Sequence, residues 1–122
     1  MNDKAKSNSA LLPSQAFDLA KLVDYADGAV VSRTIAENDS GTITLFAFDE
    51  GQNLSEHTAP FDAFVQILDG RAELVISSQA VEASAGQIVL MPANIPHAVK
   101  AQGRLKMLLT IIRNRNAQSK NE

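Results

Sequence analysis

The sequence contains no cysteine and no tryptophan, and its aromatic residues are five Phe and one Tyr. Without cysteine there is no disulfide framework, no thiolate zinc site, no iron–sulfur cluster and no cysteine nucleophile. This composition suits a reducing compartment. The first nine residues are polar and mixed in charge, without the apolar core of a secretory signal. We therefore expect a cytoplasmic protein.

Long apolar runs and clusters of one charge are also missing. No run approaches the roughly 20 apolar residues that a membrane span requires, and the longest, 107–112, has the length of a strand. The 11 basic and 14 acidic residues give a net charge of −3 and form no basic stripe. Nucleic-acid binding needs clustered Lys and Arg and often stacking aromatics. The sequence thus predicts neither a nucleic-acid partner nor a membrane partner.

Short β-type segments separated by turn residues fill most of the chain after Gly28. At 122 residues the chain fits one domain. The expected strands are 29–35, 42–48, 62–68, 71–77, 81–83, 88–91, 97–101 and 105–112. Regular short strands with hardly any helix predict an all-β sandwich or barrel, because closing or doubling the sheet removes exposed strand edges.

Turn and cap signals refine this division. Asp69-Gly70, between two expected strands, is a hairpin signal. Before the strands, Asp18 is placed to cap a short helical turn through Leu22 and Val23. The predicted division is an N-terminal lead with a short helical or extended segment (1–27), a barrel (28–113) and a polar tail (114–122).

Two segments carry glycines, prolines and histidines at characteristic offsets. They are 51–70, with a histidine at position 57, and 86–97, which ends in His97. Together they resemble the paired cupin motifs, G-x5-H-x-H-x3-4-E-x6-G and G-x5-P-x-G-x2-H-x3-N. The resemblance covers residues 28–113 and is to the small single-domain bacterial cupins (the cupin type-2 conserved barrel), a set with no assigned reaction. It implies a double-stranded β-helix, or jelly-roll barrel.

Four positions depart from these motifs. The second histidine position is Ala59 and the glutamate position is Ala63, and an alanine side chain has no donor atom for a metal. The glycine of the second motif is Asn94. Because Asn tolerates left-handed backbone angles, we expect Asn94 to make the same turn. The terminal asparagine position is Ala101.

The resemblance places the ligand positions of both motifs on the inner face of the barrel. His57 and His97 are the only two histidines in the chain, and we expect them to meet there. Strand alternation directs Asp62 outward, although Pro60 can delay the start of that strand. The expected pocket-lining residues are His57, Ala59, Ala63, Val65, Met91, His97 and Met107.

Three interpretations of this pocket stay open. In the favoured one, an apolar cavity binds a small molecule with the two histidines as polar contacts, and the metal site is degenerate or absent. In the second, His57 and His97 bind one divalent transition metal (Zn, Fe, Mn or Ni), and Asp62 or water completes the shell of a dioxygenase- or isomerase-type enzyme. In the third, the histidines are hydrogen-bonded core residues of a scaffold. The sequence identifies no catalytic residue.

The resemblance also implies an assembly. Cupins of this size commonly pair as homodimers. The apolar segments 17–23 and 105–112 are the candidates for the interface, because one barrel face does not bury them fully.

Overall fold

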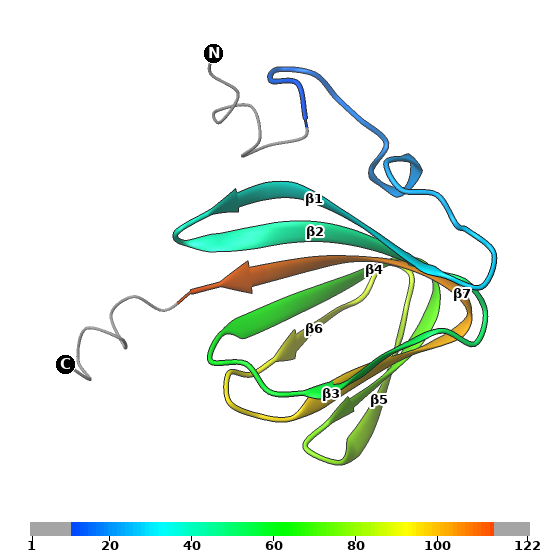
Figure 1. Ribbon diagram of the computed structural model, residues 1–122, viewed down its shortest axis with the longest axis vertical. Helices are drawn as coiled ribbons and strands as arrows, with labels where there is room; N and C mark the ends of the chain where they lie inside the picture. Colours follow the sequence, from blue (N-terminus) through cyan, green and yellow to red (C-terminus); the bar gives the residue numbers. More distant parts are fainter. Residues whose placement is uncertain (1–10, 114–122) are drawn as a thin grey trace.

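In the computed structural model, which describes residues 11–113, nearly all regular structure is β-strand. The pairs are antiparallel, and the sheet runs β1-β2-β7-β4-β5, with β3 beside β7 and β6 beside β4. A 3-10 turn, η1 (Leu19–Lys21), precedes the strands (Figure 1). The strands are β1 (Val30–Asn38), β2 (Gly41–Phe48), β3 (Asn53–His57), β4 (Asp62–Ile76), β5 (Gln79–Ser84), β6 (Ile88–Met91) and β7 (His97–Ile112).

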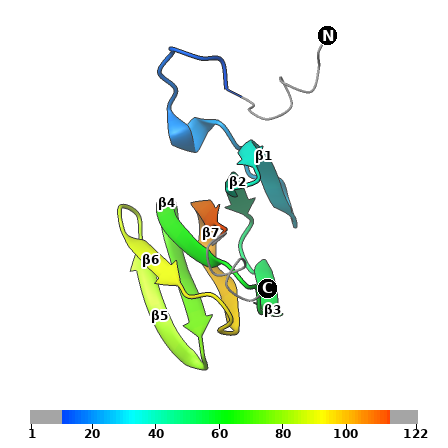
Figure 2. The same cartoon turned by 90° about the vertical axis from the view of Figure 1, so that its left-hand side faces the viewer.

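β4 and β7 run through the whole barrel and pair with each other along their length. The first half of β4 lies between β6 and the end of β7, and its second half lies between β5 and the start of β7. Both strands bend. In Figure 2, β4, β5 and β6 lie on one side of β7, and β3 lies on its other side. The predicted all-β class is confirmed.

The barrel interior is filled by apolar side chains from alternate strand positions. In β4, Ala63, Val65 and Ile67 are buried while their immediate neighbours are not, as the pleat requires. Further along the strand the buried positions are Ala72 and Leu74. The alternation has therefore shifted by one residue between the two halves of the strand.

A bulge at Asp69-Gly70 causes this shift, and the hairpin predicted there is wrong. β4 continues through both residues, and its register with β7 changes on each side of Asp69. Gly70 has φ 82°, and a Cβ there would collide with the carbonyl of Arg104. The chain turns instead at Ser77 and Ser78, both with positive φ. Serine is not a usual residue at such positions, so the turn rules missed this hairpin.

Other predicted boundaries need smaller corrections. Segments 97–101 and 105–112 form one strand, β7, because Gly103 (φ 81°) bends the strand without ending it. β3 was not predicted, since Leu54 is its single large apolar residue. The strands extend from Val30 to Ile112. The expected tail, 114–122, lies outside the described residues.

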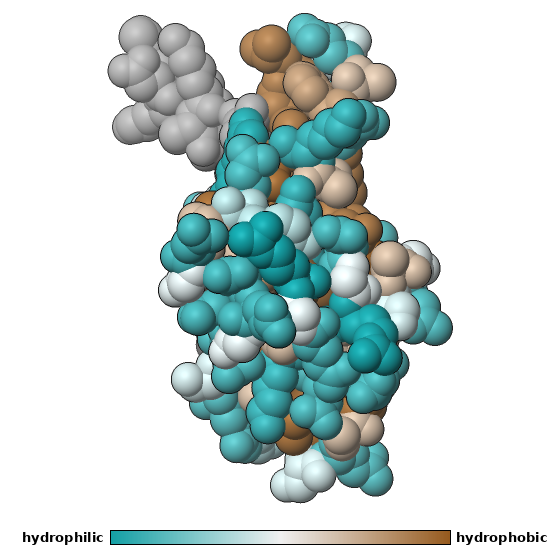
Figure 3. Space-filling view, turned by 90° about the vertical axis from the view of Figure 1, so that its right-hand side faces the viewer, coloured by the Kyte–Doolittle hydropathy of each residue, from teal (hydrophilic) through white to brown (hydrophobic). Residues whose placement is uncertain are grey.

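Residues 11–27, here called the N-terminal strap, lie along the outside of the barrel next to β1 (Figure 1). Leu22 and Val23 of the strap contribute to a second apolar cluster with Leu45 and Ala47 of β2, both fully buried. The face in Figure 3 is mostly hydrophilic, and hydrophobic residues gather at its upper end, where the strap lies. The strap therefore covers apolar surface that faces away from the barrel interior.

The helical turn predicted in the strap is present but shifted. It spans Leu19–Lys21, and Leu22 follows as its C-cap residue. Asp18 is the N-cap residue, but its side chain accepts no capping hydrogen bond. Its carboxylate instead lies 3.4 Å from the Lys21 ammonium. Within residues 11–113, no helix is long and apolar enough to cross a membrane.

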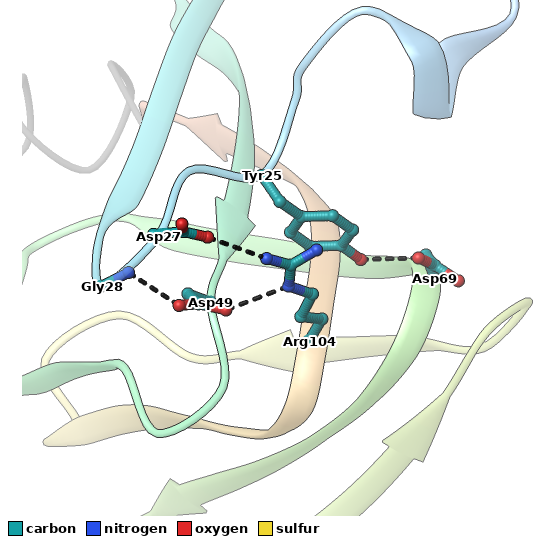
Figure 4. A network of polar contacts seen from close by, with 6 residues as sticks. All are labelled: Tyr25, Asp27, Gly28, Asp49, Asp69 and Arg104. Carbon is teal, nitrogen blue, oxygen red and sulfur yellow. Dashed lines mark hydrogen bonds and ion pairs between the residues drawn. The ribbon is translucent and has the colours of Figure 1, made fainter.

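Tyr25 holds the strap against β7. The Arg104 guanidinium and the Lys106 ammonium each lie 4.9 Å from the centroid of its ring. Its hydroxyl donates a hydrogen bond to Asp69 at 2.5 Å (Figure 4). Burial first, and then Asp69, raise the pKa of Tyr25 well above its ordinary value. Lys106 also donates to the carbonyl of Ala20 at 2.6 Å, so β7 holds the strap at two points.

Arg104 extends this contact to the start of β1. It donates to Asp49 at 3.0 Å and to Asp27 at 3.3 Å (Figure 4). Asp49 in turn accepts from the backbone N–H of Gly28 at 2.7 Å. The hydrogen bond from Gly28, followed by that from Arg104, lowers the pKa of Asp49 to about 2. The network therefore ties the end of the strap to both β2 and β7.

Candidate functional site

The inner face of the barrel surrounds a cavity of about 50 Å³. A buried water needs roughly 10–15 Å³ measured in this way, so the cavity holds a few waters or part of a small organic molecule. A larger ligand extends through the mouth or moves side chains. Two of the eleven lining residues are polar, His57 and His97. The other nine are Leu54, Ala59, Phe61, Ala63, Met91, Val99, Met107, Leu109 and Ile111.

The structure brings six of the seven predicted lining residues to this cavity: His57, Ala59, Ala63, Met91, His97 and Met107. The seventh, Val65, is a correction. It is fully buried and points inward like Ala63, two residues earlier on β4, but it is not among the residues that line the cavity. Among the lining residues that the sequence analysis did not name, Leu109 and Ile111 continue the alternation from Met107 and could have been found that way.

His57 and His97 meet, as predicted. They are partners across the β3–β7 pair, and their rings make an edge-to-face contact with centroids 4.6 Å apart and planes at 78°. Each Nδ1 lies near the carbonyl oxygen two residues earlier: Ser55 at 3.0 Å for His57, and Ile95 at 3.1 Å for His97. A carbonyl can only accept, so each Nδ1 carries the proton. The lone pair of each neutral ring is therefore on Nε2.

The two histidines differ in burial. His57 is exposed at the mouth of the cavity, whereas His97 is 3% exposed. Burial first, and then the neighbouring His57, lower the pKa of His97 below its ordinary value, and the Ile95 carbonyl opposes this in part. His97 is therefore a neutral imidazole near pH 7.

The Nε2 of His97 reaches the cavity. This nitrogen has no hydrogen-bond partner among residues 11–113. Yet no fully buried side-chain nitrogen or oxygen in that part of the chain lacks a partner. The Nε2 atom is therefore not fully buried, and the space it contacts is the cavity that His97 lines.

Asp62 lies outside the cavity. It is exposed at the start of β4 and is not one of the residues that line the cavity. Its Oδ1 accepts a hydrogen bond from the backbone N–H of Ala93 at 2.9 Å. The next residue, Asn94, has φ 65°, which confirms that it makes the left-handed turn expected of the motif glycine. Asp62 thus supports the loop that leads to His97.

The donor set does not fit a three-ligand metal centre. Metal sites that carry out chemistry usually have three protein ligands. Here Ala59 and Ala63 occupy two of the ligand positions, and the Asp62 carboxylate is bonded elsewhere. Within the described part of the chain, no group of three or more His, Asp or Glu side chains lies close enough to hold a metal ion. Two imidazoles remain, and any further ligands would be water.

A family model for the cupin domain matches residues 44–112, more than half of the chain. This chain is a cupin. Among solved structures, it is similar to a conserved protein of unknown function from Streptococcus pyogenes, with 35% identity and a TM-score of 0.82 over 85% of this chain and 91% of the other. A cupin superfamily protein from Desulfitobacterium hafniense has 29% identity and a TM-score of 0.81, covering 85% of this chain and 95% of the other.

A further similar structure is a cupin 2 conserved barrel domain protein from Leptotrichia buccalis, with 36% identity and a TM-score of 0.78. It covers 80% of this chain, and this cupin spans 47% of that longer chain. No functionally curated protein matches the sequence. These similarities confirm the double-stranded β-helix, and no activity is named for any of the three proteins.

Proposed function

We propose that this cupin binds a small organic molecule in the barrel cavity, with His57 and His97 as its polar contacts and without a complete metal site. The lining of the cavity is the observation that carries the proposal. It is apolar except for two imidazoles, and alanines stand at two of the ligand positions of the family motif. Apolar walls with a few placed polar groups are typical of small-molecule sites.

A blocked cavity tests this proposal. We expect Ala59→Leu to fill the cavity, because Ala59 lines it from the loop between β3 and β4. Ala80→Leu makes the same change on β5, where Ala80 is exposed and outside the cavity lining. A thermal-shift screen on chelator-treated protein should give compounds that stabilise the wild type and Ala80→Leu but not Ala59→Leu. Compounds that stabilise all three proteins equally would contradict binding in the cavity.

One observation favours a second candidate function, a metal-dependent enzyme of dioxygenase or isomerase type that uses His57 and His97 with water as the remaining ligands. Metal-bound histidines usually donate their second ring nitrogen to a carbonyl or carboxylate, and both Nδ1 atoms here do so.

Metal content separates the two candidates. Fe(II), Mn(II), Ni(II) and Zn(II) would be offered in turn to the tag-free wild type and to the His57→Ala/His97→Ala double variant, and bound metal measured by mass spectrometry. Near one metal per chain, lost in the double variant, would favour the enzyme. Substoichiometric metal that is unchanged in the double variant supports the metal-free pocket.

We also propose that this cupin forms a homodimer. Of the two segments expected at the interface, Phe17 is 41% exposed and Ile112 is 51% exposed, whereas Leu105 is fully buried and cannot contribute. β6 adds two neighbouring apolar residues on one face, Ile88 at 58% and Leu90 at 46% exposed. Burial of such side chains against a second copy is a common reason for pairing.

The cytoplasmic location and the lack of nucleic-acid or membrane partners stay predictions from composition. If the location is correct, the protein meets its ligand in the cytosol. Fractionation of cells that express the tagged full chain would test the location.

A further inference from the structure

We infer that the ligand of this cavity is an uncharged, hydroxyl-bearing molecule whose O–H donates a hydrogen bond to Nε2 of His97. The inference rests on the proposed function, because it names the class of molecule that the same cavity takes. It goes beyond that function in predicting which polar group the ligand carries, its charge, and which end enters first.

The first step is that the cavity offers hydrogen-bond acceptors and no side-chain donors. Both imidazoles use their Nδ1–H on backbone carbonyls, at Ser55 and Ile95. In a neutral ring with its proton on Nδ1, the remaining nitrogen, Nε2, carries the lone pair. The other nine lining residues have apolar side chains. A ligand group that only accepts, such as an ether or a halogen, has no side-chain partner here, whereas a hydroxyl can donate.

The second step concerns charge. No Lys, Arg, Asp or Glu is among the eleven lining residues, and His97 is only 3% exposed. A carboxylate or phosphate would lose its hydration and find no lysine or arginine to balance its charge. An ammonium group would find no carboxylate to balance its charge. Burying an unpaired charge is costly, so a neutral ligand is favoured.

The third step concerns orientation and size. His97 is 3% exposed, whereas His57 is exposed at the mouth. A hydroxyl that reaches His97 therefore lies further from solvent than His57, and the body of the ligand extends past His57 toward the mouth. A cavity of about 50 Å³ admits the hydroxyl end and part of a compact apolar body. Phe61 and Leu54 are among the apolar side chains that would contact this body.

A pair of probes that differ in one group tests the inference. Phenol and fluorobenzene have nearly the same shape, but only phenol donates a hydrogen bond. Dissociation constants would be measured on the chelator-treated full chain at pH 7.5, together with the ¹⁵N shifts of the two histidines. We expect phenol to bind about tenfold more tightly than fluorobenzene. Phenol forms one buried hydrogen bond, whereas fluorobenzene leaves the Nε2 acceptor of His97 unpaired. The Nε2 signal of His97 should shift with phenol alone.

Variants locate the contact. His97→Phe removes the acceptor, so the affinities for phenol and fluorobenzene should become equal. Glu56→Gln, a change at the exposed neighbour of His57, should leave the tenfold difference intact. If His97→Phe does not fold, the ¹⁵N shift of His97 in the wild type still decides the matter, because it needs no substitution.

The outcomes separate this inference from the proposed function. Equal affinities for phenol and fluorobenzene, both lost in Ala59→Leu, would overturn the inference and leave cavity binding standing. A phenol affinity that Ala59→Leu does not change would overturn both. A shift of the His57 Nε2 signal without one at His97 would also overturn the inference, since it would place the hydroxyl at the mouth.

Discussion

Tyr25 is the single tyrosine of the chain, so ultraviolet absorbance follows its ionisation directly. Burial, the hydrogen bond to Asp69 and the charge of Asp69 raise its pKa, and Arg104 opposes them. We predict a titration midpoint above 10, the ordinary value for tyrosine. Since the unfolded chain loses this proton first, stability should fall as the pH rises above about 10.

Asp69→Asn is the matched control for this titration. It removes the carboxylate that accepts the hydroxyl proton and should move the midpoint toward 10, while the packing of the ring between Arg104 and Lys106 is kept. A wild-type midpoint at 10, or one that Asp69→Asn leaves unchanged, would contradict the hydrogen bond between Tyr25 of the strap and Asp69 of β4.

His97 gives the second prediction at this scale. Its pKa in the folded chain is lowered, chiefly by burial and then by His57, whereas in the unfolded chain it returns to about 6.5. Between the two values the unfolded state binds more protons, so stability rises with pH across that window. The contribution is complete above about pH 6.5 and is lost as the pH falls below it.

Urea denaturation of chelator-treated protein at pH 7.5 and at pH 5.5 measures this effect. We expect the free energy of unfolding to drop more in the wild type than in His97→Phe, which has no imidazole to protonate. An NMR titration of His97 should give a midpoint below 6.5. A midpoint at or above 6.5 would show that burial does not control the pKa of His97.

At the scale of elements, the bend of β4 depends on Gly70. Its φ of 82° is unfavourable for other residues, and a Cβ would also collide with the Arg104 carbonyl. Gly28 has a similar φ of 66° but open space around it. We predict a loss of about 1–2 kcal/mol of stability for Gly28→Ala from backbone strain alone, and about 3–5 kcal/mol for Gly70→Ala from strain plus overpacking. Urea denaturation measures both losses of stability. Equal losses for the two variants would mean that the backbone near Arg104 shifts to accommodate the new Cβ at position 70.

At the scale of the whole molecule, the exposed apolar face of β6 gives a prediction about assembly. Leu90 and Ile88 lie on this face, next to Phe64 of β4, which pairs with Leu90. Leu90→Glu puts a charge on this face and should convert the proposed dimer to a monomer in sedimentation equilibrium. Gln79→Glu adds the same charge at an exposed site on β5 and should leave the dimer intact. A wild type that is monomeric at all concentrations would contradict the proposed dimer.

The amino-acid sequence by itself determined the fold class and the main polar pair of the cavity. The period-2 patterns predicted an all-β chain, because they report which residues one face of a strand must bury. The resemblance to the paired cupin motifs implied that His57 and His97 meet, and the backbone tolerance of asparagine explained Asn94. The strand pattern and the turn at Asn94 are local, so a short stretch of sequence is enough to specify them, whereas the meeting of the two histidines follows from the family fold.

Other features depended on contacts between residues far apart in the chain, and only the tertiary structure decided them. Asp69-Gly70 has the sequence of a hairpin but forms a bulge, because β7 pairs with β4 on both sides of it. Val65 has the right alternation and is fully buried, but the packing of its neighbours keeps it out of the cavity lining. The contacts of Tyr25 with β4 and β7 are set by how strands pack, which no local pattern encodes. Periodicity specifies the face on which a side chain lies, and packing specifies what that side chain meets.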